Sequence, residues 1–186
     1  TLAETTLVPS LTNDNSTQYT FSSTEGGTIT IGGDCSSDND TAVADNMTVS
    51  FAALPDGTYS NCTITVEDSA GNTVTIDVNP FTIDTTAPIL AEVTAVPNPT
   101  NDNTSSYTFS STEIGTITYG GSCSSSSNDN ISVVDNNTIT FNALAEGTYS
   151  NCKISVTDNA TNTSDNLSVS SFTIDKTAPT VTQVTA

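Results

Sequence analysis

The 186-residue chain contains the same sequence twice, and this internal repeat limits the possible folds more than any other feature. The run from Tyr19 to Glu25 returns as Tyr107 to Glu113, and the run from Gly57 to Cys62 returns as Gly147 to Cys152. A copy of roughly 90 residues is long enough to form its own hydrophobic core. We therefore predict an array of whole domains, with a first domain at residues 1–86 and a second at residues 87–177.

The last residues, 178–186, match the beginning of a copy. The run from Thr180 to Ala186 aligns with the run from Ile89 to Ala95, which opens the second copy. We expect this segment to be the first strand of a third repeat in a longer array. The alternative is an assembly strand that pairs with the sheet edge of another chain.

The charge of the chain is strongly one-sided, with 21 Asp and Glu against 2 Lys and Arg and a formal net charge of −19. Phosphate backbones bind clustered Lys and Arg, so the composition excludes a nucleic-acid partner. It also disfavours anionic membrane surfaces, and no segment approaches the roughly 20 apolar residues of a transmembrane helix. The carboxylates favour binding of cations such as Ca²⁺ over the alternative that they serve only solubility.

Each copy carries one pair of cysteines at matching positions: Cys35 and Cys62 in the first, Cys123 and Cys152 in the second. Two thiols per domain cannot complete a tetrahedral zinc site in a chain without His. The pairs therefore predict one disulfide within each domain and an oxidising, extracellular compartment.

Apolar residues alternate with Thr and Ser in short runs, and no run has helical spacing. About seven such strands in about 90 residues predict an all-β chain of two sandwich domains. A shift in the alternation between Val78 and Phe81, and between Val169 and Phe172, predicts a bulge late in the last strand of each domain. The predicted core consists of Phe21, Ile29, Val49, Phe51, Ile64, Val66 and Ile76 in the first domain, and Phe109, Ile117, Ile139, Phe141, Ile154, Val156 and Val169 in the second.

The run from Asp56 to Tyr59, shortly before Cys62, looks like the turn and tyrosine corner of an immunoglobulin-like domain. Together with the runs Thr12–Asn15, Glu67–Asn72 and Ile83–Pro88, all repeated in the second copy, it resembles the bacterial Ig-like repeats of large cell-surface adhesins of the Bap-like, biofilm-associated type. This resemblance covers nearly the whole chain. It implies two tandem Ig-like domains in an extracellular stalk, stiffened by Ca²⁺ at the domain junction.

The topology of an Ig-like sandwich then indicates which residues could bind that Ca²⁺. Asp84 ends the first domain, and it should face Glu113, Asp158 and Asn162 in turns of the second. The equivalent half-sites are Glu25, Asp68 and Asn72 at the start of the first domain, and Asp175 at the end of the second. The alternative is that these Asp and Asn residues only form turns.

Other chemistry is weakly supported. A Ser-His-Asp triad is impossible without His, and the acidic residues lie at turns rather than in a sugar-binding cleft built with Trp or Arg. We therefore predict that the protein is not an enzyme. Sequons are frequent, and the candidate glycosylation sites, in a host that uses them, are Asn15, Asn46, Asn103 and Asn136.

We expect a non-catalytic structural segment of a cell-surface adhesin or extracellular fibre, with neighbouring repeats or copies of itself as partners. One alternative is an Ig-like module that binds carbohydrate or protein. Its recognition surface would lie in the most divergent loop, Asp34–Asp45 in the first copy and Ser122–Asp135 in the second. Another alternative is a filament subunit that assembles by β-strand addition.

Overall fold

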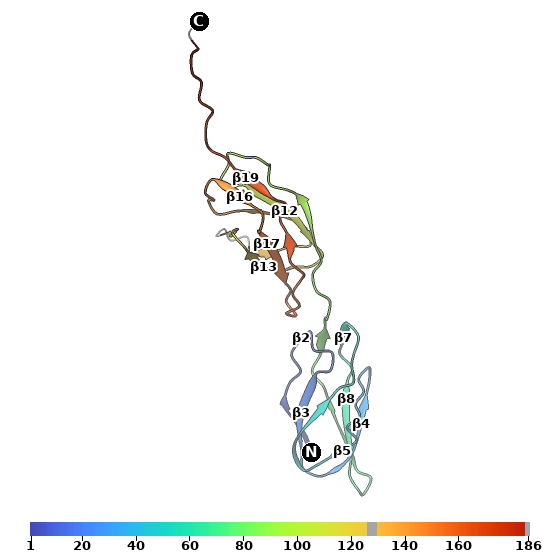
Figure 1. The fold of residues 1–186 in the computed structure, drawn as a ribbon. Helices are drawn as coiled ribbons and strands as arrows, with labels where there is room; N and C mark the ends of the chain where they lie inside the picture. Colours follow the sequence, from blue (N-terminus) through green and yellow to red (C-terminus); the bar gives the residue numbers. More distant parts are fainter. Residues whose placement is uncertain (126–129, 185–186) are drawn as a thin grey trace. The chain divides into compact units, whose positions relative to one another are not determined.

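The computed structural model describes residues 1–125 and 130–184, and its described residues form β-strands and no helix. The chain divides into two compact units, Thr1–Thr86 and Ala87–Ala186 (Figure 1). Among the described residues, no helix is long and apolar enough to cross a membrane. The described residues 175–184 form no strand, so the assignment of 178–186 to a third repeat stays a prediction.

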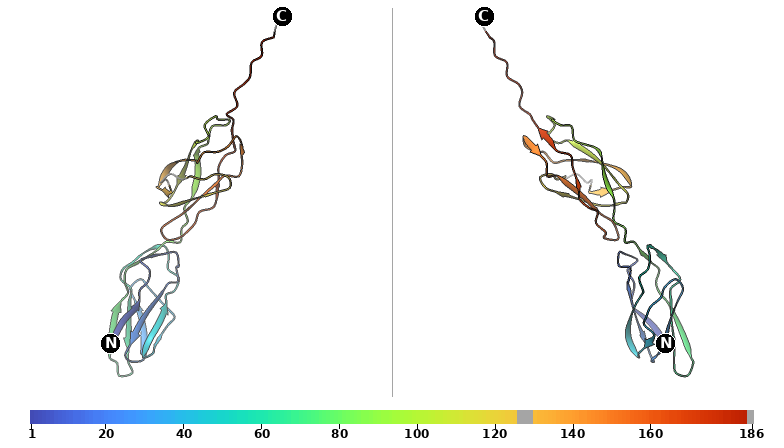
Figure 2. Two further views of the ribbon diagram at one scale, coloured as in Figure 1. Left: turned by 90° about the vertical axis from the view of Figure 1, so that its left-hand side faces the viewer. Right: turned by 45° about the vertical axis from the view of Figure 1, so that its right-hand side comes forward.

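The first unit is built from three small sheets, whose strands run roughly along its long axis (Figure 2). One sheet has the order β1 (Leu2–Thr6), β3 (Gln18–Ser23) and β6 (Asp45–Ser50). The second has the order β5 (Thr41–Ala42), β4 (Gly27–Gly32), β8 (Thr63–Glu67) and β9 (Thr73–Asp77). The third has the order β2 (Leu11–Thr12), β10 (Phe81–Ile83) and β7 (Gly57–Tyr59).

The second unit repeats this order. Its sheets are β11 (Leu90–Thr94), β12 (Ser106–Ser111) and β15 (Asp135–Thr140); β14 (Ile131–Ser132), β13 (Gly115–Gly120), β17 (Lys153–Thr157) and β18 (Leu167–Ser168); and β16 (Gly147–Tyr149) with β19 (Phe172–Ile174). A parallel bridge from Thr100 to Ile174 stands where the first unit has β2. The prediction of two all-β sandwich domains is confirmed.

Each unit has its own hydrophobic core, and the predicted core residues are buried in both, with Ile76 the one exception. Ile76 is only partly buried because β9 is the edge strand of its sheet. Aromatic rings stack in equivalent positions: Phe51 on Phe81 with ring centroids 6.1 Å apart, and Phe141 on Phe172 with centroids 6.2 Å apart. Alternation of apolar residues with Thr and Ser forms these cores because successive strand residues point to opposite faces.

The bulge predicted between Val78 and Phe81 is wrong. Two chain segments face each other here, and both leave the strand conformation at the same level. One segment breaks between β7 and β8, and the other breaks between β9 and β10. Tyr59 pairs with Phe81 and Thr63 with Asp77, so the register is the same before and after the break. A bulge would add a residue to one strand only.

The second unit shows the same paired break, and the bulge predicted between Val169 and Phe172 is wrong as well. Tyr149 pairs with Phe172 and Lys153 with Ser168, again in one register. Both residues before the shift in alternation, Val78 and Val169, donate a backbone hydrogen bond across the break, to the carbonyls of Cys62 and Cys152 at 2.9 and 3.0 Å.

A β-bulge lies instead before β18 in the second unit. Thr157 bridges Thr163 and Lys153 pairs with Ser168. The segment from Thr163 to Ser168 therefore has one residue more than the segment from Lys153 to Thr157 that it faces. Ser164 compensates there, because its Oγ accepts a hydrogen bond from the Val156 amide at 2.9 Å. The strand β18 is therefore shorter than its counterpart β9.

The two predicted disulfides, Cys35–Cys62 and Cys123–Cys152, are present. Cys35 follows β4 and Cys62 directly precedes β8, and these strands are neighbours in one sheet. The disulfide therefore joins neighbouring strands of one sheet rather than two facing sheets.

The predicted tyrosine corner is also present in both units. The Tyr59 hydroxyl donates a hydrogen bond to the Pro55 carbonyl at 2.8 Å, and the Tyr149 hydroxyl donates one to the Ala145 carbonyl at 3.0 Å. Each bond closes the loop that precedes the tyrosine onto the strand that contains it.

Replacing Tyr59 with Phe should lower the free energy of unfolding of the first unit by about 1 kcal/mol, because it removes one hydrogen bond and leaves the Pro55 carbonyl without it. Urea denaturation followed by circular dichroism measures the change. Tyr149→Phe should lower the stability of the second unit by a similar amount. An unchanged midpoint in both variants would show that the corner does not stabilise the sandwich.

Candidate functional site

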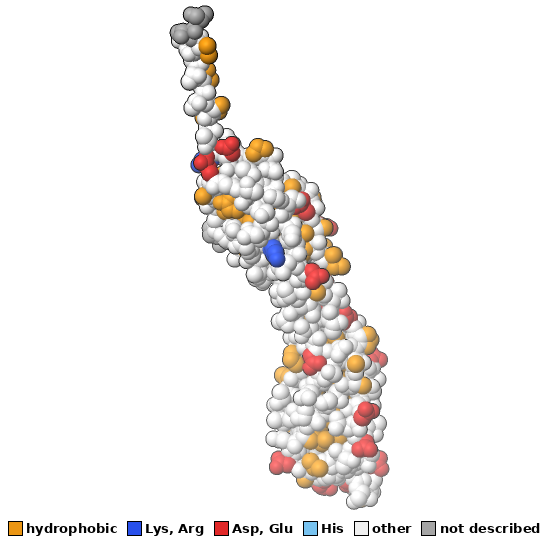
Figure 3. Space-filling model, in the orientation of Figure 1, with side chains coloured by type: hydrophobic (Ala, Val, Ile, Leu, Met, Phe, Trp, Pro, Cys, Tyr) orange, Lys and Arg blue, Asp and Glu red, His pale blue; other side chains and the backbone are white. Residues whose placement is uncertain are grey.

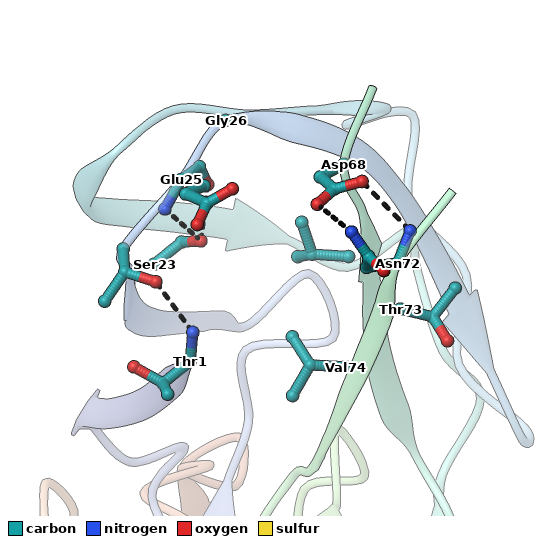
Figure 4. Close-up of a pocket in the computed structure, with 10 residues that line it drawn as sticks. Thr1, Ser23, Glu25, Gly26, Asp68, Asn72, Thr73 and Val74 are labelled. Carbon is teal, nitrogen blue, oxygen red and sulfur yellow. Dashed lines mark hydrogen bonds between the residues drawn. The ribbon is translucent and has the colours of Figure 1, made fainter. Parts of the chain in front are cut away.

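One end of the first unit brings together three of the residues that the sequence singles out for cation binding. Glu25 lies in the turn between β3 and β4, and Asp68 and Asn72 lie in the turn between β8 and β9. Figure 4 shows these side chains around a pocket of about 320 Å³, to which Thr1 and Val74 also contribute. Glu25 and Asp68 both line this pocket.

The Asp68 carboxylate is, however, already engaged by its own turn. Its Oδ1 accepts hydrogen bonds from the amides of Ala70 at 2.7 Å and Asn72 at 2.9 Å, and its Oδ2 accepts one from Asn72 Nδ2 at 2.8 Å. These bonds, above all the one from the Asn72 side chain, hold the pKa of Asp68 below its usual value. Asp68 and Asn72 thus form the turn, as the alternative interpretation of the sequence proposes.

The corresponding turn of the second unit has the matching hydrogen bonds from its Asn and a pair of neighbouring carboxylates. Asp158 accepts bonds from the Asn162 amide at 2.9 Å and from Asn162 Nδ2 at 2.8 Å, and Asp158 is buried. Carboxylate oxygens of Asp158 and Glu113 lie within 4.8 Å of one another. Two carboxylates this close repel each other, and a hard cation with oxygen ligands would reverse that repulsion.

The two aspartates at the ends of the units also shape the backbone. Asp84 Oδ1 accepts a hydrogen bond from the Thr86 amide at 3.2 Å, and Asp175 Oδ1 accepts one from the Thr177 amide at 2.9 Å. Asp84 belongs to the first unit, whereas Glu113 and Asp158 belong to the second. A site shared by Asp84 with those two residues stays a prediction.

The role of Asp56 is not evident from the sequence alone. Its Oδ1 accepts hydrogen bonds from the Thr85 amide at 2.9 Å and the Thr85 hydroxyl at 2.7 Å, and its Oδ2 accepts one from the Thr86 hydroxyl at 2.7 Å. The bond from the Thr85 hydroxyl, followed by those from the Thr86 hydroxyl and the Thr85 amide, holds the pKa of Asp56 below its usual value.

Glu146 takes the same position in the second unit. Its Oε1 accepts hydrogen bonds from the Lys176 amide at 2.7 Å and from the Thr177 hydroxyl at 3.1 Å. The signal in the sequence is an acidic residue directly before Gly-Thr-Tyr in both copies, with Thr recurring after the last strand. The hydrogen-bond donors to this acidic residue lie 29 to 31 residues further along the chain, so the sequence alone does not connect the acid with its donors.

The candidate glycosylation sites lie at accessible positions: Asn15, Asn46 and Asn136 are exposed, and Asn103 is half-buried. Glycosylation itself stays a prediction.

Acidic side chains occur along both units on the face drawn in Figure 3.

The most divergent loop differs in its exposed apolar side chains, although residues 126–129 of the second copy lie outside the described part of the chain. Ile131, Val133 and Val134 are 66, 51 and 57% exposed in the second unit. Thr41, Val43 and Ala44 hold these positions in the first unit.

A comparison with family models agrees with the fold of the first unit. Residues 6–85 match the family model described as a bacterial Ig-like domain. No curated protein matches the chain. Among solved structures, the chain is similar to the fibronectin(III)-like modules of Clostridium thermocellum CbhA, with a TM-score of 0.46 and 13% sequence identity over 94% of each chain.

Proposed function

We propose that this chain, whose first unit matches the bacterial Ig-like domain, is a non-catalytic structural segment of a cell-surface adhesin or an extracellular fibre. The main support is repetition of structural devices. Both units have the same strand order, the same disulfide, the same tyrosine corner and an acidic residue that binds the segment after the last strand. Repeating a whole stable domain adds length, which suits a spacer.

The disulfides support a location outside the cytoplasm. Each cysteine of the pairs is at most 5% exposed, and structural disulfides persist in oxidising compartments. Bacterial Ig-like domains with disulfides suggest an extracytoplasmic location. In this setting the disulfides and the acidic, Thr-rich faces keep each domain folded and soluble. The partners are neighbouring repeats of the same chain or copies of it.

An antibody raised against this chain tests the location. It should label intact cells of the source organism, and protease added outside the cells should remove the label. Labelling that appears only after the cells are permeabilised would contradict a surface segment.

We further propose that Ca²⁺ binds Glu113 and Asp158 in the second unit, with Asp84 as the additional ligand that the sequence predicts. The closeness of the two carboxylates supports this proposal, because carboxylate oxygens are the preferred ligands of Ca²⁺. Glu25 and Asp68 would form the weaker equivalent in the first unit, and Asp175 would contribute to a further repeat.

Ca²⁺ should raise the stability of the second unit, by about 2.7 kcal/mol at a concentration 100 times the dissociation constant. Calorimetry with and without Ca²⁺ measures the shift in melting temperature. Glu113→Gln combined with Asp158→Asn should abolish the shift, and Asp165→Asn, which removes an exposed charge from the same unit, should preserve it. If Ca²⁺ leaves the melting temperature of the parent chain unchanged, these acidic residues only form turns.

A second function, protein binding, is favoured by the exposed apolar side chains of the second unit. Replacing Ile131 and Val134 with their first-unit counterparts, Thr and Ala, should weaken the attachment of cells that display the protein to the protein partner. The melting temperature of the variant should stay within 2 °C of that of the parent chain. Full attachment by that variant would favour a pure spacer.

A further inference from the structure

The segment that follows the last strand of the first unit, Thr85 and Thr86, is hydrogen-bonded to the carboxylate of Asp56 in another loop. Gly57 on β7 pairs with Ile83 on β10, so the residue before Gly57 and the residues after Ile83 lie side by side. Asp56 uses this position to accept three hydrogen bonds, one from the Thr85 amide and two from the hydroxyls of Thr85 and Thr86. Bonds to an ionised acceptor are stronger than bonds between neutral groups.

The second unit builds the same arrangement from different residues. Gly147 pairs with Ile174, and Glu146, directly before Gly147, accepts bonds from the Lys176 amide and the Thr177 hydroxyl. The backbone donor is at the same position in both units, although the acid is Asp in one and Glu in the other. Asp in one unit and Glu in the other make the same contact with the backbone. This indicates that the structure requires an acidic acceptor at this position rather than one particular residue type.

The entry to each unit is also held by hydrogen bonds. In the second unit the Ile89 amide donates to Thr112 Oγ1 at 2.9 Å, and the Thr112 amide donates to the Ile89 carbonyl at 3.1 Å. In the first unit the Thr1 amino group donates to Thr24 Oγ1 at 2.7 Å, and the Thr24 amide donates to the Thr1 carbonyl at 3.1 Å. Between the segment bound by Asp56 and the segment bound by Thr112 lie two residues, Ala87 and Pro88, and the proline ring restricts the backbone further.

We propose that Asp56 and Glu146 are linker clamps, which hold the chain as it leaves each unit and limit the flexibility of the following linker without any metal ion. The clamp shortens the freely rotating part of the linker to Ala87 and Pro88. It acts inside one unit and therefore does not depend on the Ca²⁺ or the cell-surface location proposed above. In a spacer it would retain part of the stiffness when Ca²⁺ is low.

The test measures amide hydrogen exchange by NMR on the whole chain in the presence of EDTA. Asp56→Ala removes every acceptor of the clamp and should speed exchange of the Thr85 amide at least tenfold, because a bond to a charged acceptor is lost. ¹⁵N relaxation should show larger nanosecond motion of the residues from Thr85 to Ala87. Asp38→Ala, which removes an exposed charge elsewhere in the first unit, should leave both quantities unchanged.

Two further variants separate the clamp from general destabilisation. Thr85→Val with Thr86→Val removes the two hydroxyl donors but keeps the backbone amide of residue 85 as a donor. The exchange rate of that amide should therefore rise by a smaller factor than in Asp56→Ala. Exchange of the Ile64 amide, in the core strand β8, reports whether the first unit remains folded. If Asp56→Ala unfolds the unit, Asp56→Asn, which keeps the size of the side chain, replaces it and should speed Thr85 exchange at least threefold.

Exchange of the Thr85 amide within twofold of the parent chain in a folded Asp56 variant would overturn the clamp. That result would leave the spacer function intact, since the spacer depends on surface labelling. Conversely, a failure of surface labelling or of Ca²⁺ binding would leave the Thr85 exchange rates as expected here.

Discussion

Replacing Phe51 with Ala is expected to lower the free energy of unfolding of the first unit by about 3–5 kcal/mol, the usual range for a buried aromatic side chain. Phe51 is 2% exposed, and its ring stacks on Phe81 at an interplanar angle of 9°. The substitution removes apolar contacts and leaves a cavity that the surrounding strands can fill only in part. Because a domain of this size is stable by only about 5–15 kcal/mol, the loss is a large fraction of the total.

Calorimetry of the whole chain should resolve the effect by unit. Phe51→Ala should move the unfolding transition of the first unit to lower temperature, and Phe141→Ala should do the same for the second, because the two cores are separate. Val43→Ala is the matched control, since Val43 is 54% exposed and its truncation should change stability by less than about 0.5 kcal/mol. A Phe51→Ala chain with an unchanged transition would show that the core is assigned to the wrong residues.

Removing the disulfide of one unit should have an effect of similar size. Cys35 and Cys62 are separated by 27 residues, and a cross-link over a loop of this length contributes about 3.5 kcal/mol in the chain-entropy model. Cys35→Ala with Cys62→Ala should therefore lower the urea midpoint of the first unit strongly. Both side chains are buried, so Ala is preferred to Ser, which would bury a hydroxyl.

The second unit supplies the matched comparison for the disulfide. Cys123→Ala with Cys152→Ala opens a loop with a separation of 29 residues and should destabilise the second unit by nearly the same amount. Adding a reductant to the double variant of one unit should then affect only the other unit. If neither double variant changes its midpoint, the neighbouring strands, β4 with β8 and β13 with β17, hold each loop without the cross-link.

Local patterns in the sequence were sufficient for the architecture. Alternation with period two predicted the strands and the residues of the core, because each strand buries only one of its faces. Equivalent positions in the two copies predicted which cysteines pair. The edge position of Ile76 was not predictable in this way, because burial at an edge depends on which strands are neighbours.

The shift in alternation at Val78 is the clearest case in which a correct observation led to a wrong structure. A change of phase along one strand predicts an added residue if the neighbouring strand is regular. Here the neighbouring strand breaks at the same level, between Tyr59 and Thr63, so both strands change phase together and keep their register. The state of the partner strand, which is distant in the sequence, decides between these outcomes.

The sequence by itself determined the number of domains, their all-β class, much of their cores and the disulfides, since these follow from residue type, spacing and the repetition of the two copies. Tertiary structure decided how the polar residues are used. Asp68, a possible metal ligand in the sequence, accepts hydrogen bonds from Asn72 and Ala70 within its own turn, whereas Asp56 accepts hydrogen bonds from Thr85 and Thr86, which follow the last strand. By residue type a carboxylate can both accept hydrogen bonds and bind a cation, and only the positions of the neighbouring donors and carboxylates decide what it contacts.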